Sequence, residues 1–180
     1  MILFVTGNEN KFKEVYRNIN TNIKQSDIDL VEIQGTPNEI ILNKCKEAVK
    51  IQGKIDLFVE DISLCFNVLN GFPGPYIKWA LKSLGNEKLY KLLDGFEDKS
   101  GYAICMYCYY NSKIDEYSIF SGKTDGLIVK PRGSLNFGWD SIFQPLCSNK
   151  TYAEMEFNEK DSISHRSKAL KLMKKYLEKF

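Results

Sequence analysis

The sequence holds only one histidine, His165, among its 180 residues. A zinc cage of several histidines and an H-E-x-x-H helix are therefore excluded, because each needs at least two imidazoles. The glycine-rich phosphate motifs are missing as well. No G-x-x-x-x-G-K-[ST] occurs, and no two glycines stand two residues apart, as G-x-G-x-x-G requires. Any phosphate-binding segment must therefore be of another kind.

Long apolar runs and a strong charge of one sign are also missing. No run of roughly 18 apolar residues exists, and the first ten residues, MILFVTGNEN, lack a basic leader, so we expect neither a membrane span nor a secretion signal. The net charge of +2 argues against a nucleic-acid partner. Five irregularly spaced cysteines favour free thiols in the cytoplasm. The pair Cys105 and Cys108 lies in an apolar, strand-like run, so we favour buried thiols over a redox or zinc pair.

The order of the apolar runs predicts an α/β protein. Strand, helix, strand, helix and strand are expected over residues 2–5, 11–19, 28–33, 38–52 and 56–59. This alternation is typical of a sheet whose faces are covered by helices. The chain length favours a single domain over residues 1–180, and we expect it to have two lobes with a cleft between them.

The rest of the chain predicts a fixed loop, a hairpin and a closing helix. Residues 71–76 form a loop rich in proline and glycine, followed by helices over 77–84 and 87–93. Residues 102–110 and 116–121 are expected to pair as antiparallel strands, with a further strand over 126–130. Residues 164–180 form an amphipathic helix, whose lysines we assign to a solvated face and not to a binding patch.

The first candidate site is the hexapeptide TGNENK, which comprises Thr6, Gly7, Asn8, Glu9, Asn10 and Lys11. It joins a predicted strand to a predicted helix. The N-terminus of a helix presents unpaired N–H groups and a positive dipole end, which favour phosphate. Lys11 adds a positive charge beside it. An ordinary turn without a ligand is the alternative.

Three acidic residues lie at the ends of predicted strands: Glu32, Glu60 and Asp61. Ligands of open α/β sheets collect at the carboxyl ends of the strands, so we expect the three carboxylates to lie near one another. Mg²⁺ prefers such oxygen ligands, and a further carboxylate can deprotonate an attacking water. Because Glu60 and Asp61 are consecutive, their side chains point opposite ways on a strand, and only one would face the site directly. Solvated acids at strand ends are the alternative.

Two lysines extend the set of candidates. Lys44 lies on the second predicted helix, and Lys78 follows the rigid GFPGPY loop and precedes Trp79. Either lysine is a candidate for binding substrate. Each could instead lay its aliphatic stem over apolar surface and hold its ammonium in water.

The last candidates are aromatic and basic. The segment FGWD comprises Phe137, Gly138, Trp139 and Asp140. An aromatic ring can stack on a nucleobase and a carboxylate can accept from a ring N–H, although core aromatics are the alternative. His165 and Arg166 stand in the first turn of the last predicted helix, where cations are unfavourable unless an anion or a carbonyl is near. Lys160 precedes them and could join them.

Together these features predict a Mg²⁺-dependent nucleotide hydrolase. The segments that carry the pattern are TGNENKFKEV, VEDISLCFNVLNGFPGPYIKW, GFEDKS, FGWDSIFQP and TYAEM…EKDSISHRSKAL. In this order they closely resemble the Ham1 family of inosine triphosphate pyrophosphatases, in its eukaryotic type. The resemblance implies hydrolysis of inosine, deoxyinosine and xanthosine triphosphates (ITP, dITP and XTP) to the monophosphate and pyrophosphate, which removes non-canonical purines from the nucleotide pool. It also implies a two-lobed mixed-sheet α/β fold with a central cleft, Mg²⁺ with Mn²⁺ as a possible substitute, a homodimer and a cytoplasmic location.

The resemblance also implies roles for individual residues. The segment from Thr6 to Lys11 would hold the triphosphate. Glu32 and Asp61 would bind the metal, with Asp61 or Glu60 activating the attacking water. Lys44 and Lys78 would contact the substrate, and the residues around the base would be Phe137, Gly138, Trp139, Asp140, Lys160, His165 and Arg166. Donors facing the 6-oxo group of the purine would reject adenine, and we expect His165 and Arg166 to supply them.

Two other functions stay open at this point. One is a related pyrophosphatase that prefers modified pyrimidine triphosphates, which a substrate panel separates. The other is a nucleotide-binding sensor without turnover. Glu32, Glu60 and Asp61 weigh against a sensor, because a protein that only binds needs no carboxylate to activate water.

One position departs from the family pattern. The family usually has threonine after the Glu-Asp pair, where this chain has Ile62. Ile62 lacks a hydroxyl that could bond a phosphate oxygen or a metal-bound water, although Ile62 can still contribute its backbone N–H. We therefore expect Ile62→Thr to raise the affinity for ITP modestly. Steady-state kinetics and equilibrium binding check this, and unchanged affinity and turnover would show that the hydroxyl is not needed.

Overall fold

The computed structural model of the chain describes all residues except 20, 136 and 180. It divides the chain into two compact units. Unit 1 comprises Met1–Asp61, Cys105–Gly122 and Arg166–Phe180, and unit 2 comprises Ile62–Ile104 and Lys123–His165. No helix among the described residues has both the length and the apolar character to cross a bilayer. The five cysteines are free, and Cys105 and Cys108 are buried, as predicted.

In the described part of the chain, seven strands form a mixed sheet, and unit 1 holds its parallel part. β1 (Ile2–Val5) pairs in parallel with β2 (Ile23–Ser26) and with β3 (Leu57–Phe66). β5 (Ser100–Asn111) and β6 (Glu116–Ile128) follow β3 in the strand order. β5 and β6 are adjacent in the sheet and joined by residues 112–115 alone, as in the predicted antiparallel hairpin.

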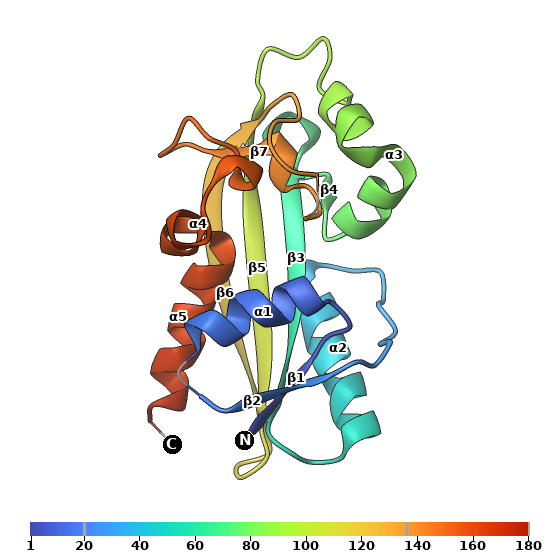
Figure 1. The fold of residues 1–180 in the computed structure, drawn as a ribbon. Helices are drawn as coiled ribbons and strands as arrows, with labels where there is room; N and C mark the ends of the chain where they lie inside the picture. The colour runs from blue at the N-terminus through green and yellow to red at the C-terminus, as the bar shows by residue number, and fades with distance from the viewer. Residues whose placement is uncertain (20, 136, 180) are drawn as a thin grey trace. The chain divides into compact units, whose positions relative to one another are not determined.

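Helices cover both faces of the sheet in unit 1. On one face, Phe12 of α1 (Glu9–Asn18) stacks on Phe4 of β1, and Tyr176 of α5 (His165–Leu177) contacts Tyr109 of β5. Figure 1 shows α1 crossing the strands and α5 running beside β6. On the other face, the Cys45 thiol of α2 (Pro37–Gln52) lies 3.4 Å from the backbone oxygen of Cys108. The α/β class predicted from the sequence is confirmed.

Unit 2 is built on the continuation of the same strands. β4 (Pro73–Gly74) pairs antiparallel with β3, and β7 (Phe143–Pro145) pairs antiparallel with β6. α3 (Ile77–Lys91) lies beside β4 in Figure 1, and α4 (Phe157–Ile163) ends just before α5. The core of this unit is apolar and aromatic, with Leu64, Phe66, Leu89, Trp139, Phe143 and Tyr152 among its buried members.

Residues 71–76 are held by backbone hydrogen bonds, as expected of a fixed loop. Phe66 donates to the carbonyl of Phe72 at 3.1 Å, and Gly71 donates to the carbonyl of Phe66 at 3.0 Å. Gly71 and Gly74 have φ values of 90° and 56°, a region that side chains with a Cβ rarely occupy. The glycines are therefore required for this turn. The loop also contains the short strand β4, which the sequence analysis did not predict.

The strand predicted over 28–33 is wrong. The strand at this place in the order is β2 at Ile23–Ser26, which pairs with β1, whereas residues 27–33 have no regular structure. Of the apolar side chains that suggested a strand, Val31 is 70% exposed and Ile33 is 36% exposed, whereas Ile28 and Leu30 are half-buried. Ile23, by contrast, is buried. Pairing with β1 therefore decided which segment became the strand, and the apolar pattern did not.

Several predicted boundaries also change. β3 runs to Phe66 instead of ending at 59, and residues 126–130 form no separate strand because β6 continues to Ile128. The two helices predicted over 77–84 and 87–93 are found as two helical stretches of α3, separated at Gly85, whose φ of 68° is not helical. α4 and β7 were not predicted. The last helix ends at Leu177, and residue 180 of the prediction lies outside the described residues.

The packing of unit 1 depends on an aromatic cluster on the face of α1. Phe58 is fully buried, with its ring centroid 4.4 Å from that of Phe4 and 5.8 Å from that of Tyr107. We expect Phe58→Ala to lower the free energy of unfolding by about 3–5 kcal/mol, because it leaves a cavity. The control is Ile114→Ala, in the exposed turn between β5 and β6, which should change the free energy of unfolding by less than about 0.5 kcal/mol. Urea denaturation measures both, and equal losses would contradict the assignment.

Candidate active site

The TGNENK segment forms the turn between β1 and α1, as the sequence predicts. The Asn8 side chain caps α1 by accepting a hydrogen bond from the backbone N–H of Lys11 at 3.0 Å. The Thr6 hydroxyl accepts from the N–H of Asn8 at 3.2 Å. A Cβ at Gly7 would lie 2.5 Å from a carboxylate oxygen of Asp27, so a larger residue there would require the Asp27 side chain to move. The turn thus presents the N-terminus of a ten-residue helix.

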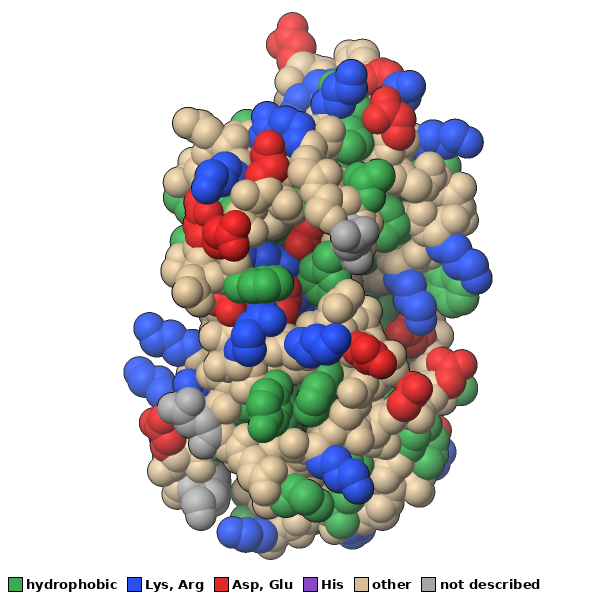
Figure 2. All heavy atoms as spheres, in the orientation of Figure 1, with side chains coloured by type: hydrophobic (Ala, Val, Ile, Leu, Met, Phe, Trp, Pro, Cys, Tyr) green, Lys and Arg blue, Asp and Glu red, His purple; other side chains and the backbone are tan. Residues whose placement is uncertain are grey.

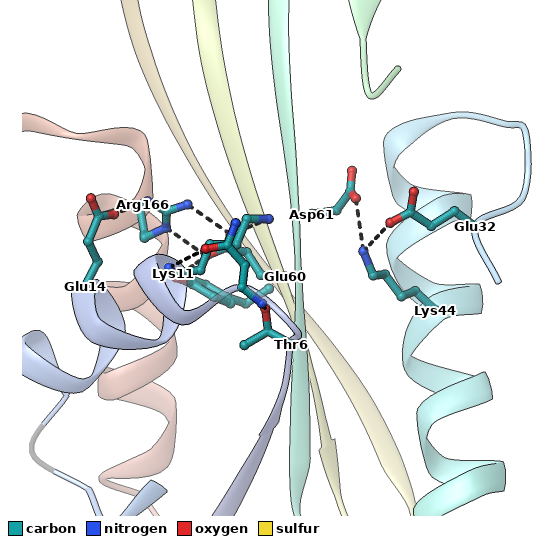
Figure 3. Close-up of polar contacts among 10 residues, drawn as sticks. Thr6, Lys11, Glu14, Glu32, Lys44, Glu60, Asp61 and Arg166 are labelled. Carbon is teal, nitrogen blue, oxygen red and sulfur yellow. Dashed lines mark hydrogen bonds and ion pairs between the residues drawn. The ribbon is translucent and has the colours of Figure 1, made fainter. Parts of the chain in front are cut away.

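Glu60 lies at the centre of a buried ion-pair network on the face of α1 and α5. Its carboxylate accepts from Arg166 at 2.8 and 3.1 Å and from the Tyr107 hydroxyl at 2.9 Å, and it pairs with Lys11 at 3.0 Å. Arg166 also pairs with Glu14 (Figure 3). Two carboxylates and two cations therefore balance in this network.

Asp61 extends from the opposite side of β3 (Figure 3). There the ammonium of Lys44 on α2 lies 2.8 Å from a carboxylate oxygen of Glu32 and 3.5 Å from one of Asp61. Glu32 belongs to the loop between β2 and α2. One ammonium thus serves two carboxylates, and this cluster carries an excess negative charge.

The electrostatics of the two neighbouring acids differ in sign. Burial raises the pKa of Glu60, but Arg166 and Lys11 outweigh burial and hold that pKa well below its usual range. Burial raises the pKa of Asp61 as well, and there Lys44 and Lys11 only partly offset it. Burial lowers the pKa of Lys44, but the carboxylates of Asp61 and Glu32 outweigh it and raise that pKa. Glu60 is therefore fixed in its ionised form, whereas Asp61 binds a proton more readily than an ordinary aspartate.

The donor set at Asp61 suits a hard divalent cation. Among the residues that the structure describes, no three His, Cys, Asp or Glu side chains form a complete metal-binding group. Mg²⁺, however, commonly takes one or two carboxylates and completes its shell with water and substrate phosphates. Glu32 and Asp61 provide two carboxylates with an uncompensated negative charge.

Unit 2 brings together most of the predicted base-binding residues. Lys160 pairs with Asp140 at 2.5 Å, and both are buried. The Lys160 ammonium also lies 4.4 Å from the ring centroid of Phe137. The His165 ring lies 5.4 Å from that of Trp139, and Gly138 precedes this tryptophan in the same segment. These residues form one aromatic and charged cluster.

Other predicted residues are placed differently from this cluster. Lys78 is exposed on α3, with its ammonium 5.4 Å from the Trp79 ring. Ile62 packs against the buried core of unit 2. Arg166 directs its guanidinium at Glu14 and Glu60 in unit 1. Its expected contact with a base stays a prediction.

The strand ends proposed for the three acids are wrong, although the predicted convergence of Glu32 with Asp61 is found. Glu60 and Asp61 lie in the middle of β3, and Glu32 lies in a loop. The alternation along β3, which the sequence predicts, sends the two acids to opposite faces. The cluster of Glu32, Lys44 and Asp61 therefore forms beside a strand and not at its end.

Sequence reasoning missed three residues that contact predicted site residues. Glu14 pairs with Arg166, Tyr107 donates to Glu60, and the Tyr152 ring stacks 5.7 Å from that of His165. Glu14 stands three residues after Lys11, so helical spacing could have placed both on one face of α1. No comparable spacing in the sequence points to Tyr107 or Tyr152.

Charged groups on both faces of a mixed sheet, next to a strand-to-helix turn, are features of α/β proteins that bind phosphorylated ligands. The chain belongs to the Ham1 family, whose model matches residues 2–176. Membership of this family classes the chain as a hydrolase.

Individual relatives agree with this classification. The chain is 46% identical over 180 residues to the inosine triphosphate pyrophosphatase of Batrachochytrium dendrobatidis (strain JAM81 / FGSC 10211), covering 98% of this chain and 94% of the relative. The Ham1 protein of Staphylococcus aureus superposes with a TM-score of 0.82 at 25% identity, covering 99% of this chain and 98% of the other. A HAM1 protein from Coxiella burnetii gives 0.84 at 26% identity, with the same coverage.

The opposite pKa shifts of the two acids predict opposite effects on stability. Because the pKa of Glu60 is lower in the folded than in the unfolded protein, its ionised carboxylate stabilises the fold above the unfolded pKa of about 4.3. This stabilisation is lost as the pH falls below that value. We expect Glu60→Gln to cost about 3–5 kcal/mol at pH 7, because it leaves buried cations without a partner. The difference in the free energy of unfolding between Glu60→Gln and the unmodified protein should become smaller as the pH is lowered from about 4.3.

The control for Glu60→Gln is Asp61→Asn, which replaces the neighbouring carboxylate by an amide in the same way. Because the folded pKa of Asp61 is raised, its contribution to stability is present below the unfolded value of about 3.9 and is lost as the pH rises. As the pH rises above about 3.9, the stability of Asp61→Asn should therefore increase relative to that of the unmodified protein. Urea denaturation, followed by circular dichroism at several pH values from about 3 to about 7, measures the free energy of unfolding of the two variants and of the unmodified protein. If the stability differences of the two variants from the unmodified protein changed with pH in the same direction, the opposite pKa shifts of Glu60 and Asp61 would be contradicted.

Proposed function

We propose that this protein hydrolyses the non-canonical purine nucleotides ITP, dITP and XTP to the nucleoside monophosphate and pyrophosphate, with water attacking the α-phosphorus. The observation that carries the proposal is the convergence of Glu32, Lys44 and Asp61 in unit 1, in a chain of the Ham1 family. The 46% identity with a relative named inosine triphosphate pyrophosphatase supports this choice of substrates.

The triphosphate is assigned to the turn between β1 and α1. The helix end there favours negative charge, and its N–H groups can donate to phosphate oxygens. Lys11 stands in the first turns of α1, where its ammonium also acts on Asp61. Lys11 is therefore proposed to neutralise charge on the pyrophosphate leaving group. Lys44 and Lys78 are assigned to further contacts with the substrate.

A divalent cation, Mg²⁺ with Mn²⁺ as a possible substitute, is assigned to Glu32 and Asp61. When bound, it would neutralise phosphate charge and polarise the phosphoryl group that is attacked. The excess negative charge of the two carboxylates over Lys44 supports this assignment.

Asp61, and not Glu60, is the proposed acceptor of the proton from the attacking water. A base works best when its pKa lies near the operating pH, and burial moves the pKa of Asp61 in that direction. The pKa of Glu60 moves the other way, and Arg166, Lys11 and Tyr107 already donate to its oxygens. Glu60 is therefore proposed to position Lys11 and Arg166.

The base is assigned to the cluster in unit 2. Phe137 and Trp139 offer ring faces, and Asp140 holds Lys160 beside them. His165 and Arg166 are the proposed donors to the 6-oxo group, and Arg166 would have to turn from Glu14 and Glu60 to serve as one. Adenine would present its amino group to these donors and leave them unpaired, which rejects the wrong ligand strongly. The family resemblance further supports a homodimer, a cytoplasmic location and a single two-lobed domain.

The test is a product assay with ITP, XTP, ATP, GTP and a modified pyrimidine triphosphate, each with Mg²⁺ present and then chelated. Pyrophosphate and inosine monophosphate from ITP, with little product from ATP, are expected. Release of inorganic phosphate and the diphosphate would contradict attack at the α-phosphorus. Binding of ITP without product would establish a sensor instead.

A further inference from the structure

A hollow in unit 1 is lined by one stripe of α5 and has no part in the proposed reaction. Residues spaced by three and four positions lie on one side of a helix. The stripe and its extension just beyond the helix comprise Ser167, Leu170, Lys171, Lys174, Lys175 and Glu178. Asn18, the last residue of α1, lines the hollow as well.

The hollow has the size of a small-molecule site. Its volume is about 400 Å³, within the range of roughly 300–1,000 Å³ usual for such sites. Leu170, which is 2% exposed, contributes an apolar wall. Lys174 is held at the edge, because its ammonium donates to the backbone oxygen of Asn18 at 2.9 Å. An ammonium has two further N–H groups that a ligand can use.

The lining includes lysines that the sequence analysis assigned to a solvated face; Lys171 and Lys175 are exposed, as that assignment expects, but they also line this hollow together with Lys174. Three lysines and one glutamate line it, which gives an excess of two positive charges. Figure 2 shows Lys and Arg side chains gathered in the region where Figure 1 places α5. Lys171 stands three and four residues from Lys174 and Lys175, a spacing at which like charges repel.

The helix dipole does not account for all three lysines. Lys174 and Lys175 lie in the last turn of α5, where the negative dipole end favours cations. Lys171 lies about one turn earlier, where this effect has faded. A bound anion would offset the repulsion among the three ammonium groups.

We propose that this hollow, the α5 pocket, binds a small phosphate-bearing anion. The three ammonium groups and the Ser167 hydroxyl offer several donors to phosphate oxygens. Inorganic phosphate, pyrophosphate and a nucleoside monophosphate share this chemistry. The volume exceeds what one phosphate needs, so pyrophosphate or the monophosphate is the expected ligand. The α5 pocket is distinct from the residues assigned to the reaction, and its occupancy does not depend on turnover.

The test is isothermal titration of the full chain with pyrophosphate, inorganic phosphate and inosine monophosphate in separate experiments. The variant is Lys171→Gln combined with Lys175→Gln. The matched control is Lys168→Gln combined with Lys179→Gln, which removes the same charge from lysines that do not line the pocket. The pocket variant should lose one binding event or weaken it at least tenfold, and the control should keep it within twofold. Circular dichroism confirms that both variants are folded.

The outcomes separate the α5 pocket from the proposed function. If pyrophosphate also binds the active site as a product, the unmodified protein shows two events and the pocket variant keeps one. If the proposed function fails, the unmodified protein shows one event and the pocket variant none. If the pocket variant and the control lost affinity for the anion equally, binding would depend only on the overall positive charge of the surface, and the proposal of the α5 pocket would be wrong. Unchanged binding in the pocket variant would overturn it as well.

Discussion

The side chains of consecutive residues on a strand point to opposite faces of the sheet, and the arrangement of unit 1 depends on this constraint at Glu60 and Asp61. The two acids are neighbours in β3, yet they meet different partners on different elements. Glu60 meets α1 and α5 through Lys11 and Arg166, whereas Asp61 meets Lys44 of α2. One strand thereby supplies two faces of the sheet with a carboxylate each.

The surroundings then give the two carboxylates different chemistry. Glu60 is buried with two cations and a tyrosine hydroxyl, which compensate its charge and keep it ionised. Burying a charge without such partners would be strongly unfavourable, so loss of either Lys11 of α1 or Arg166 of α5 would leave the Glu60 carboxylate of β3 poorly compensated. Asp61 shares a single ammonium with Glu32, and its charge is only partly offset. An incompletely compensated carboxylate is suited to binding a cation or accepting a proton.

Local signals allowed the turn at residues 6–11, the α2 helix and the hairpin of β5 and β6 to be predicted. Each depends on spacing within a short segment: in α2, for example, the buried residues Ile41, Cys45, Ala48 and Val49 repeat at helical intervals. The place of β2 was not predictable in this way, because backbone pairing with β1 selected residues 23–26 over a more apolar neighbour.

The candidate site was predicted as a set of residues but not as a set of contacts. The convergence of Glu32 with Asp61 followed from the α/β pattern, although the strand ends were wrong. Arg166 joins Glu60 across 106 positions of the sequence, and Tyr107 joins it across 47. Such long-range pairs depend on the order of strands in the sheet, which no local pattern determines.

The central claim is that Glu60 and Asp61 have different roles, and the pH dependence of kcat tests it most directly. Pyrophosphate release from ITP with Mg²⁺ is measured for the unmodified protein, Glu60→Gln and Asp61→Asn at saturating substrate. We expect Asp61→Asn to lose about 10²–10⁴-fold in kcat. Glu60→Gln should raise KM and keep the acid limb of the kcat profile. Loss of that limb in Glu60→Gln, with kcat preserved in Asp61→Asn, would contradict the account.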